Sequence, residues 1–188
     1  LWKPGTAETR PAETTDEDAT AADQNDNIVL LVDRSASMGG YWAWTSDDVT
    51  TLIRGLDETQ RFDLVLFGQA DDIWQIEGKG LDVASLERKI QAIELLTFTR
   101  PAGDTDPQAG FQRAIQAIGD QPATIQFVSD GVFNHPLQVR RDLRNMLTDK
   151  SIVINTHLYG ETYPAAVSMM KAIARDGRGE YVNATQYP

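Results

Sequence analysis

Short apolar runs and amphipathic segments alternate along the chain from residue 28 onwards. The run Ile28–Val32 is continuous and rich in β-branched residues, which is typical of a strand buried on both faces. Elsewhere apolar residues recur at helical intervals, as in Leu86, Ile90 and Ile93, which predicts helices that pack one face against a sheet. The pattern predicts strands over 28–32, 62–67, 72–76, 124–129, 151–159 and 180–183, and helices over 46–56, 83–96, 107–118, 138–147 and 164–176.

This alternation of strands and helices predicts an α/β fold, in which an open and mainly parallel sheet carries helices on both faces. The segment 72–76 alternates polar and apolar residues, which favours a strand at the edge of that sheet. Asp106 followed by Pro107 is a favourable start for the helix over 107–118. In sheets of this class, ligands bind where the parallel strands end.

Residues 1–26 differ from the rest of the chain in composition. They are rich in Thr, Ala, Glu and Asp and show no apolar period, so they bury too little surface to offset the entropy of ordering. We expect a disordered acidic tether over 1–26 and one folded domain over 27–188. Because the chain begins with Leu1 rather than Met, we also expect it to be part of a longer polypeptide.

The charge and composition narrow the classes of partner. The formal net charge is −11, and residues 1–26 carry −5 of it, which disfavours nucleic acids and anionic lipids as partners. No apolar run approaches the roughly 18 residues that span a bilayer, so we expect no transmembrane segment. Cysteine is absent, which excludes disulfides, thiolate metal sites and a Cys nucleophile.

The first predicted strand ends in a run of oxygen-bearing side chains. Asp33, Ser35 and Ser37 alternate, so an extended backbone would point all three in the same direction. One carboxylate and two hydroxyls are hard donors that suit Mg2+, Mn2+ or Ca2+ rather than zinc or copper. This spacing alone is weak evidence, because Asp and Ser are common in helix caps and turns.

Two other segments can complete the coordination shell of such an ion. Asp130 follows the strand over 124–129 and precedes a Gly, which repeats the arrangement around Asp33. Thr105 lies in the loop Gly103-Asp104-Thr105-Asp106-Pro107, immediately before a predicted helix. The loops that contain Asp33, Thr105 and Asp130 therefore each offer oxygen ligands to one ion.

The set Asp33, Ser35, Ser37, Thr105 and Asp130 resembles the metal-ion-dependent adhesion site of von Willebrand factor type A domains, and the resemblance covers roughly residues 27–183. Gly103-Asp104-Thr105-Asp106-Pro107 and Gly179-Glu180-Tyr181-Val182 look most like bacterial members. The resemblance implies a Rossmann-like sheet of six strands in the order 3-2-1-4-5-6, with the strand over 72–76 antiparallel.

The resemblance also implies how the site works. Ser35 and Ser37 would bind Mg2+ directly, with Mn2+ or Ca2+ as alternatives, and Thr105 would bind directly or through water. Asp33 and Asp130 would hold coordinated waters. A vacant position on the ion would then attract an exposed Glu or Asp of a partner protein, since neutral ligands leave its charge uncompensated.

Several residues near this site are candidates for contact with the partner. Tyr41, Trp42 and Trp44 can anchor an interface, or they can cover a first helix that looks several residues shorter than is usual for the family. Arg34 could meet an acidic partner, although a solvent-facing position is also expected. Two loop acids complete the set, Asp104 as a solvated side chain and Asp106 as a helix cap.

Alternatives from other classes remain open. A metal-assisted phosphohydrolase would require a second Asp in place of Ser35 and a basic residue for the phosphate. A serine hydrolase would require a base for Ser35 or Ser37. A structural domain without a ligand is the third possibility. We expect a binding module rather than an enzyme, and the acidic tether favours display at a cell surface or envelope over a cytoplasmic location.

The chain stops soon after its last predicted strand, whereas many members of the family continue into a C-terminal helix that transmits the state of the metal site. We therefore do not expect receptor-style long-range activation.

Overall fold

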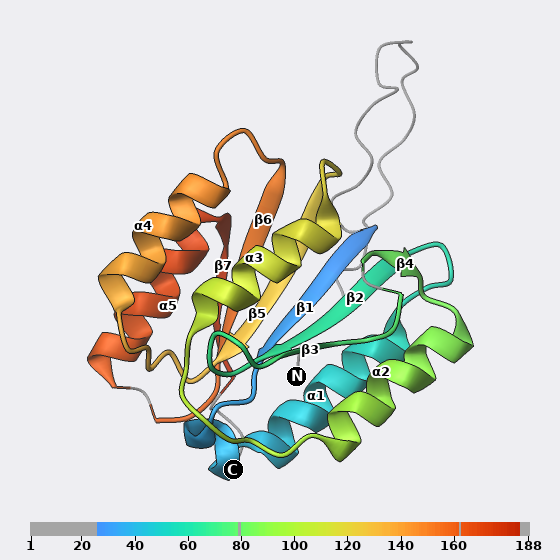
Figure 1. The fold of residues 1–188 in the computed structure, drawn as a ribbon, viewed down its shortest axis with the longest axis horizontal. Helices are drawn as coiled ribbons and strands as arrows, with labels where there is room; N and C mark the ends of the chain where they lie inside the picture. The colour runs from blue at the N-terminus through green and yellow to red at the C-terminus, as the bar shows by residue number, and fades with distance from the viewer. Residues whose placement is uncertain (1–25, 79, 162, 185–188) are drawn as a thin grey trace, which may run out of the picture.

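A mainly parallel sheet runs through the centre of the molecule and carries helices on both faces (Figure 1). The computed structural model describes residues 26–184, apart from 79 and 162. The strands are β1 (Asn27–Asp33), β2 (Arg61–Phe67), β3 (Ile73–Gln75), β4 (Asp82–Val83), β5 (Ala123–Ser129), β6 (Ile152–Leu158) and β7 (Arg178–Asn183). The helices are α1 (Trp42–Gly55), α2 (Leu86–Phe98), α3 (Pro107–Ile118), α4 (Pro136–Met146) and α5 (Pro164–Asp176), and a short 3-10 helix, η1 (Ala36–Gly40), precedes α1.

The strand order is β3-β2-β1-β5-β6-β7, and β4 pairs with the start of β2. β1, β2, β5, β6 and β7 are parallel to one another, whereas β3 and β4 run antiparallel to β2. The predicted α/β class, the strand order and the antiparallel edge strand are therefore confirmed.

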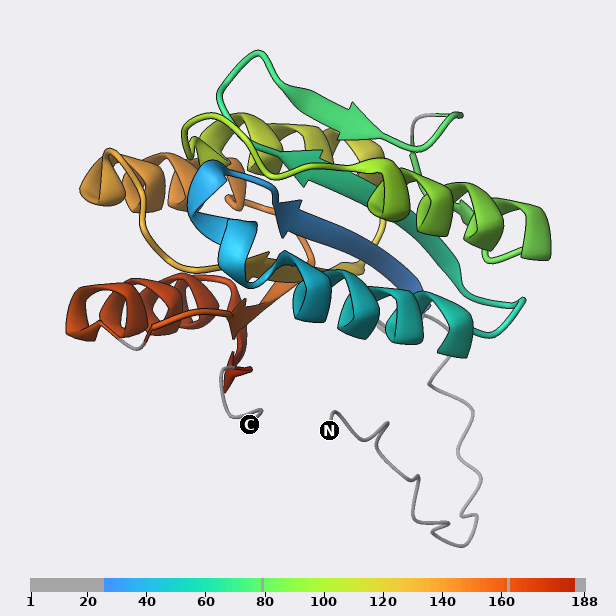
Figure 2. The same cartoon turned by 90° about the horizontal axis from the view of Figure 1, so that it is seen from below.

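The two faces of β1 explain its uninterrupted apolar run. Leu30 and Val32 pack with residues of α1 and α2, whereas Val29 and Leu31 pack with residues of α3, α4 and α5. All four side chains are at most 1% exposed. A strand with this burial delivers the residues that follow it to one edge of the sheet. Figure 2 shows β1 pointing toward η1 and the start of α1 at that edge.

Three predicted helix starts differ from the structure, and one of them is the helix predicted from 138, which begins at Pro136. The first helix begins at Trp42 rather than at residue 46, so it starts four residues earlier than predicted. The carbonyl of Tyr41 accepts hydrogen bonds from the backbone N–H and the hydroxyl of Thr45, which continues the helical turn into the aromatic segment. The second helix begins at Leu86 rather than at 83, because Ser85 caps it and the preceding residues form β4.

The predicted tether falls almost entirely on residues 1–25, which lie outside the described residues, so it stays a prediction. Within the described range, no helix is long and apolar enough to cross a membrane.

Candidate cation site at the carboxyl ends of the strands

Asp33, the last residue of β1, is the most firmly held residue of the predicted site. β1 and β5 are parallel neighbours with Val32 opposite Val128, so the ends of both strands reach the same edge. The carboxylate of Asp33 is fully buried. It accepts a hydrogen bond from the Ser35 N–H at 2.8 Å and another from the Ser129 hydroxyl at 2.7 Å. Both carboxylate oxygens are therefore held in place.

The hydroxyls of Ser35 and Ser37 lie side by side. Their Oγ atoms are 3.1 Å apart. Ser35 is 1% exposed whereas Ser37 is exposed, so the pair extends from the interior to the surface. Two oxygens about 2.1 Å from one Mg2+ and at right angles to each other would be about 3.0 Å apart. The spacing of the two hydroxyls therefore fits neighbouring positions in an octahedral shell.

Asp130 places a second carboxylate next to the first. It is 6% exposed, and its Oδ1 accepts a hydrogen bond from the Val132 N–H at 3.0 Å. The pKa of Asp33 is raised to about 6, because burial and, to a smaller extent, the charge of Asp130 outweigh the hydrogen bonds from Ser35 and Ser129, which lower it. Two neighbouring acids in a buried setting repel each other, and a cation would relieve that repulsion.

The loop that carries Thr105 is bonded to the Asp33 loop through the backbone. The N–H of Ala36 donates to the Gly103 carbonyl at 3.0 Å, and the N–H of Ala102 donates to the Arg34 carbonyl at 2.8 Å. Directly after Thr105 in the sequence, the N–H of Asp106 donates to the carbonyl of Gly68 at 2.8 Å. Thr105 itself is 8% exposed. The fold thus brings all three predicted loops to one edge.

The donor set determines which ions fit. Across the described part of the chain, no group of three or more His, Asp and Glu side chains is arranged to hold a metal ion. A cation at this edge would therefore depend on the hydroxyls of Ser35, Ser37 and Thr105 together with the two acids. Such oxygen ligands suit Mg2+, Mn2+ or Ca2+.

The structure corrects two of the predicted partner contacts. Arg34 is 3% exposed and Trp42 is 8% exposed, so neither side chain is available at the surface. Arg34 pairs with Asp72, and Trp42 packs in the core with residues of α1 and α2. The expectation that Arg34 faces solvent is wrong as well.

The other four candidates keep some exposure. Trp44 is 55% exposed, Tyr41 is half-buried, and Asp104 is exposed. Asp106 is half-buried, and its carboxylate caps α3 by accepting a hydrogen bond from the Gln108 N–H at 3.0 Å, as the sequence predicted.

Ser129 was not predicted as a site residue, although its hydroxyl donates a hydrogen bond to Asp33 and accepts one from the Gly131 N–H at 3.0 Å. It is the last residue of β5 and lies directly before Asp130, so its place at the end of a predicted strand beside a candidate ligand was the signal that could have found it. Two exposed apolar residues at the same edge were missed as well. Val132 is 51% exposed and Tyr163 is 56% exposed.

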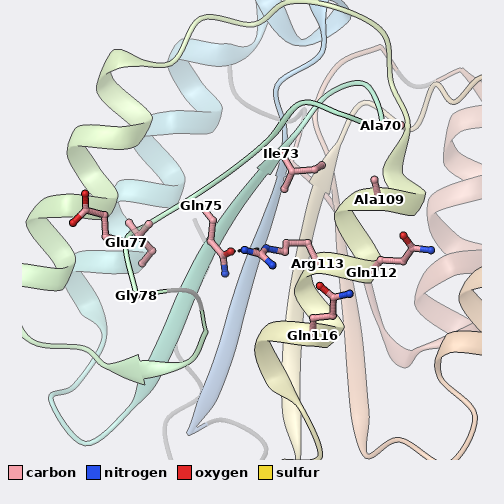
Figure 3. Close-up of a pocket in the computed structure, with 10 residues that line it drawn as sticks. Ala70, Ile73, Gln75, Glu77, Gly78, Ala109, Gln112, Arg113 and Gln116 are labelled. Carbon is pink, nitrogen blue, oxygen red and sulfur yellow. Dashed lines mark hydrogen bonds between the residues drawn. The ribbon is translucent and has the colours of Figure 1, made fainter.

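A cleft of about 820 Å3 lies elsewhere, between β3 and α3 (Figure 3). Gln75 and Arg113 face each other across it, and the Arg113 Nε donates to the Gln75 Oε1 at 2.6 Å. None of the predicted site residues lines this cleft. It is therefore separate from the candidate cation site.

Comparisons with known proteins agree with this architecture. A family model described as von Willebrand factor type A domain matches residues 26–183. A comparison with curated protein sequences finds no significant match.

Solved structures share the fold at low sequence identity. A von Willebrand factor type A protein from Catenulispora acidiphila has 16% identity and a TM-score of 0.67, over 84% of this chain and 38% of that one. The pilus adhesin SpaC from Lactobacillus rhamnosus GG, in an open conformation, has 13% identity and a TM-score of 0.69, over 88% of this chain and 28% of that one. Proximal thread matrix protein 1 from the mussel byssus, with a zinc-occupied MIDAS motif, has 16% identity and a TM-score of 0.63, over 86% of this chain and 44% of that one. The chain spans less than half of each of these proteins.

Proposed function

Because the chain belongs to the von Willebrand factor type A domain family, we propose that it is a cation-dependent protein-binding module. Its partner would present an exposed Glu or Asp at the edge formed by Asp33, Ser35 and Asp130. Mg2+ is the ion that we propose, with Mn2+ or Ca2+ as alternatives.

The single observation that carries the proposal is the 3.1 Å spacing of the Ser35 and Ser37 hydroxyls beside a fixed, buried Asp33. Hydroxyl groups normally rotate freely at a surface, but these two are hydrogen-bonded to each other, beside a carboxylate whose two oxygens both accept hydrogen bonds. That arrangement is what two neighbouring ligands of one hard ion require.

The hydroxyl and carboxylate residues of the site would have different roles. Ser35 and Ser37 would hold the ion through neutral oxygens, with Thr105 as a third hydroxyl. Asp33 and Asp130 would orient the hydroxyls and coordinated waters. When bound, the ion supplies a vacant coordination position for an anionic oxygen. Because neutral ligands leave its charge largely uncompensated, a carboxylate of the partner would be the preferred last ligand.

Exposed apolar side chains at the same edge support a protein as the partner. Trp44 at the start of α1, Val132 after β5 and Tyr163 before α5 are each more than half exposed. Exposed aromatic residues are frequent anchors of interfaces. We propose that they contact the partner around its acidic side chain, together with Tyr41, Asp104 and Asp106.

A phosphohydrolase fits the contacts less well. Arg34 is the basic residue next to Asp33, but its guanidinium is paired with Asp72 and buried. It is therefore not available to hold a phosphate, and Ser35 stands where such an enzyme would require an acid.

The chelator dependence of partner capture tests the proposal. Immobilised protein should retain a partner from a lysate of its native source in the presence of millimolar Mg2+, release it on addition of EDTA, and retain it again when Mg2+ is restored. Ser37→Ala should lose most of this capture because it removes one proposed ligand at the surface.

Ser168→Ala is the matched control, because Ser168 is an exposed serine on α5 outside the site. It should capture as the wild type does. Capture that persists in EDTA, or that Ser37→Ala leaves unchanged, would refute a cation-dependent mechanism.

A further inference from the structure

We propose that Arg34 is a positioning residue that sets the cation affinity by holding the Thr105 loop against the Asp33 loop. The inference rests on the proposed function and extends it to a side chain that is no ligand. Arg34 lies between Asp33 and Ser35 in the sequence, but its guanidinium contacts Asp72 and Trp74, at and next to the edge strand β3.

The guanidinium of Arg34 joins three segments. Its Nη2 forms an ion pair with Asp72 in the turn between β2 and β3. Its Nη1 donates to the Arg100 carbonyl at 3.3 Å, at the start of the loop that carries Thr105. The guanidinium carbon lies 4.1 Å from the ring centre of Trp74 on β3. One side chain thus connects the Asp33 loop, the Thr105 loop and the edge strand.

The backbone of Arg34 is part of the same connection. Its N–H donates to the Phe67 carbonyl at the end of β2, and its carbonyl accepts from the Ala102 N–H, both at 2.8 Å. The Thr105 loop is therefore bonded to the main chain of Arg34 at Ala102 and to its side chain at Arg100. The position of the Thr105 hydroxyl depends on how this loop is seated.

The burial of Arg34 shows that this geometry is maintained despite an energetic penalty. Arg34 is 3% exposed, and its Nε is buried without a hydrogen-bond partner among the described residues. A buried ion pair contributes little net stability, because desolvation offsets the attraction. The planar guanidinium can, however, donate to two acceptors and stack on an aromatic ring at the same time, which Lys cannot do. Its role is therefore better explained by positioning than by stability.

A role of Arg34 through its charge and a role through positioning predict opposite changes in cation affinity when Arg34 is replaced. If Arg34 acted only through its positive charge, Arg34→Gln would strengthen cation binding, because it removes a repulsive charge near the site. If Arg34 holds the Thr105 loop, the same substitution weakens binding. The double variant Arg34→Gln/Asp72→Asn removes both charges of the pair, so it leaves the net charge unchanged and isolates positioning.

The test is calorimetric titration of Mg2+ alone into wild type and variants, with circular dichroism to establish that each variant is folded. We expect Arg34→Gln/Asp72→Asn to bind Mg2+ at least tenfold more weakly, since loss of groups that orient ligands typically lowers affinity about 10- to 100-fold. Arg34→Lys keeps the charge and should lower the affinity for Mg2+ about threefold to tenfold, because Lys cannot reproduce the planar donor arrangement.

A double-mutant cycle distinguishes positioning from a general loss of stability. If Arg34 acts through the Thr105 loop, the losses in Mg2+ affinity caused by Arg34→Lys and Thr105→Ala will not be additive. Arg140→Gln/Asp176→Asn is the matched control, because Arg140 and Asp176 form an ion pair between α4 and α5. It should leave Mg2+ affinity unchanged even if it lowers the melting temperature.

Unchanged or tighter Mg2+ binding in folded Arg34→Gln/Asp72→Asn, or additive losses in the cycle, would overturn the role of Arg34 while leaving the cation site intact. A wild type that binds no Mg2+ would instead overturn the proposed function, and this inference with it.

Discussion

Replacing Asp33 with Ala should lower the affinity for Mg2+ at least about 100-fold, to the point where calorimetry detects no saturable binding. The carboxylate is fully buried, and it holds the Ser35 N–H at 2.8 Å and the Ser129 hydroxyl at 2.7 Å. Its loss would release the loop that orients the Ser35 hydroxyl and would remove one of the two negative charges at the site. Both effects act in the same direction on a bound cation.

Asp104→Ala is the control for this substitution. Asp104 is an exposed acid next to Thr105, so it contributes net charge but has no position in the proposed shell. Its loss should change Mg2+ affinity less than about threefold, because exposed charges are screened by salt. Equal losses for Asp33→Ala and Asp104→Ala would mean that the acidic edge attracts cations without a defined site.

Replacing Gly179 with Ala should destabilise the protein by about 3 kcal/mol or more, as expected for severe overpacking against a fixed backbone. Gly179 lies in β7 beside an irregularity in its pairing with β6. A Cβ there would lie 2.2 Å from the carbonyl oxygen of Ile154 and 2.6 Å from the side-chain oxygen of Asn155. Since β6 is also paired with β5, Ile154 cannot move aside without breaking the sheet.

Equilibrium unfolding in urea measures this effect. Gly55→Ala is the matched control, because a Cβ at the last residue of α1 would meet nothing within 4 Å. It should be neutral or stabilise the protein by up to about 1 kcal/mol, since Ala is a better helix former than Gly. A Gly179→Ala variant that is as stable as Gly55→Ala would show that the close approach of β7 to β6 is not a rigid feature of the fold.

The sequence predicted the sheet and the meeting of the three loops for a clear physical reason. The parallel strands are apolar on both faces, as at Val29 and Leu30, so they form continuous runs that stand out against the helices. Residues that follow such strands, including Asp33 and Asp130, necessarily gather at one edge. The cap at Asp106 was predictable because it depends only on local hydrogen bonding.

The direction of individual side chains could not be predicted in the same way. Arg34 is surrounded by polar residues in the sequence, but an acid 38 positions away and a tryptophan on the edge strand enclose it. Trp42 lies in an aromatic segment that could have been a surface loop, and it became buried because α1 begins there. These outcomes depend on contacts between distant segments, which the local pattern does not contain.

The most direct test of the cation site is X-ray diffraction from crystals of the protein soaked in Mn2+, with data collected to locate anomalous scattering. We expect one strong anomalous peak at the edge of the sheet, about 2.2 Å from the Oγ atoms of both Ser35 and Ser37 and within reach of Thr105. Anomalous peaks found only elsewhere, or no peak near the two serines at saturating Mn2+, would rule out a cation site at this edge.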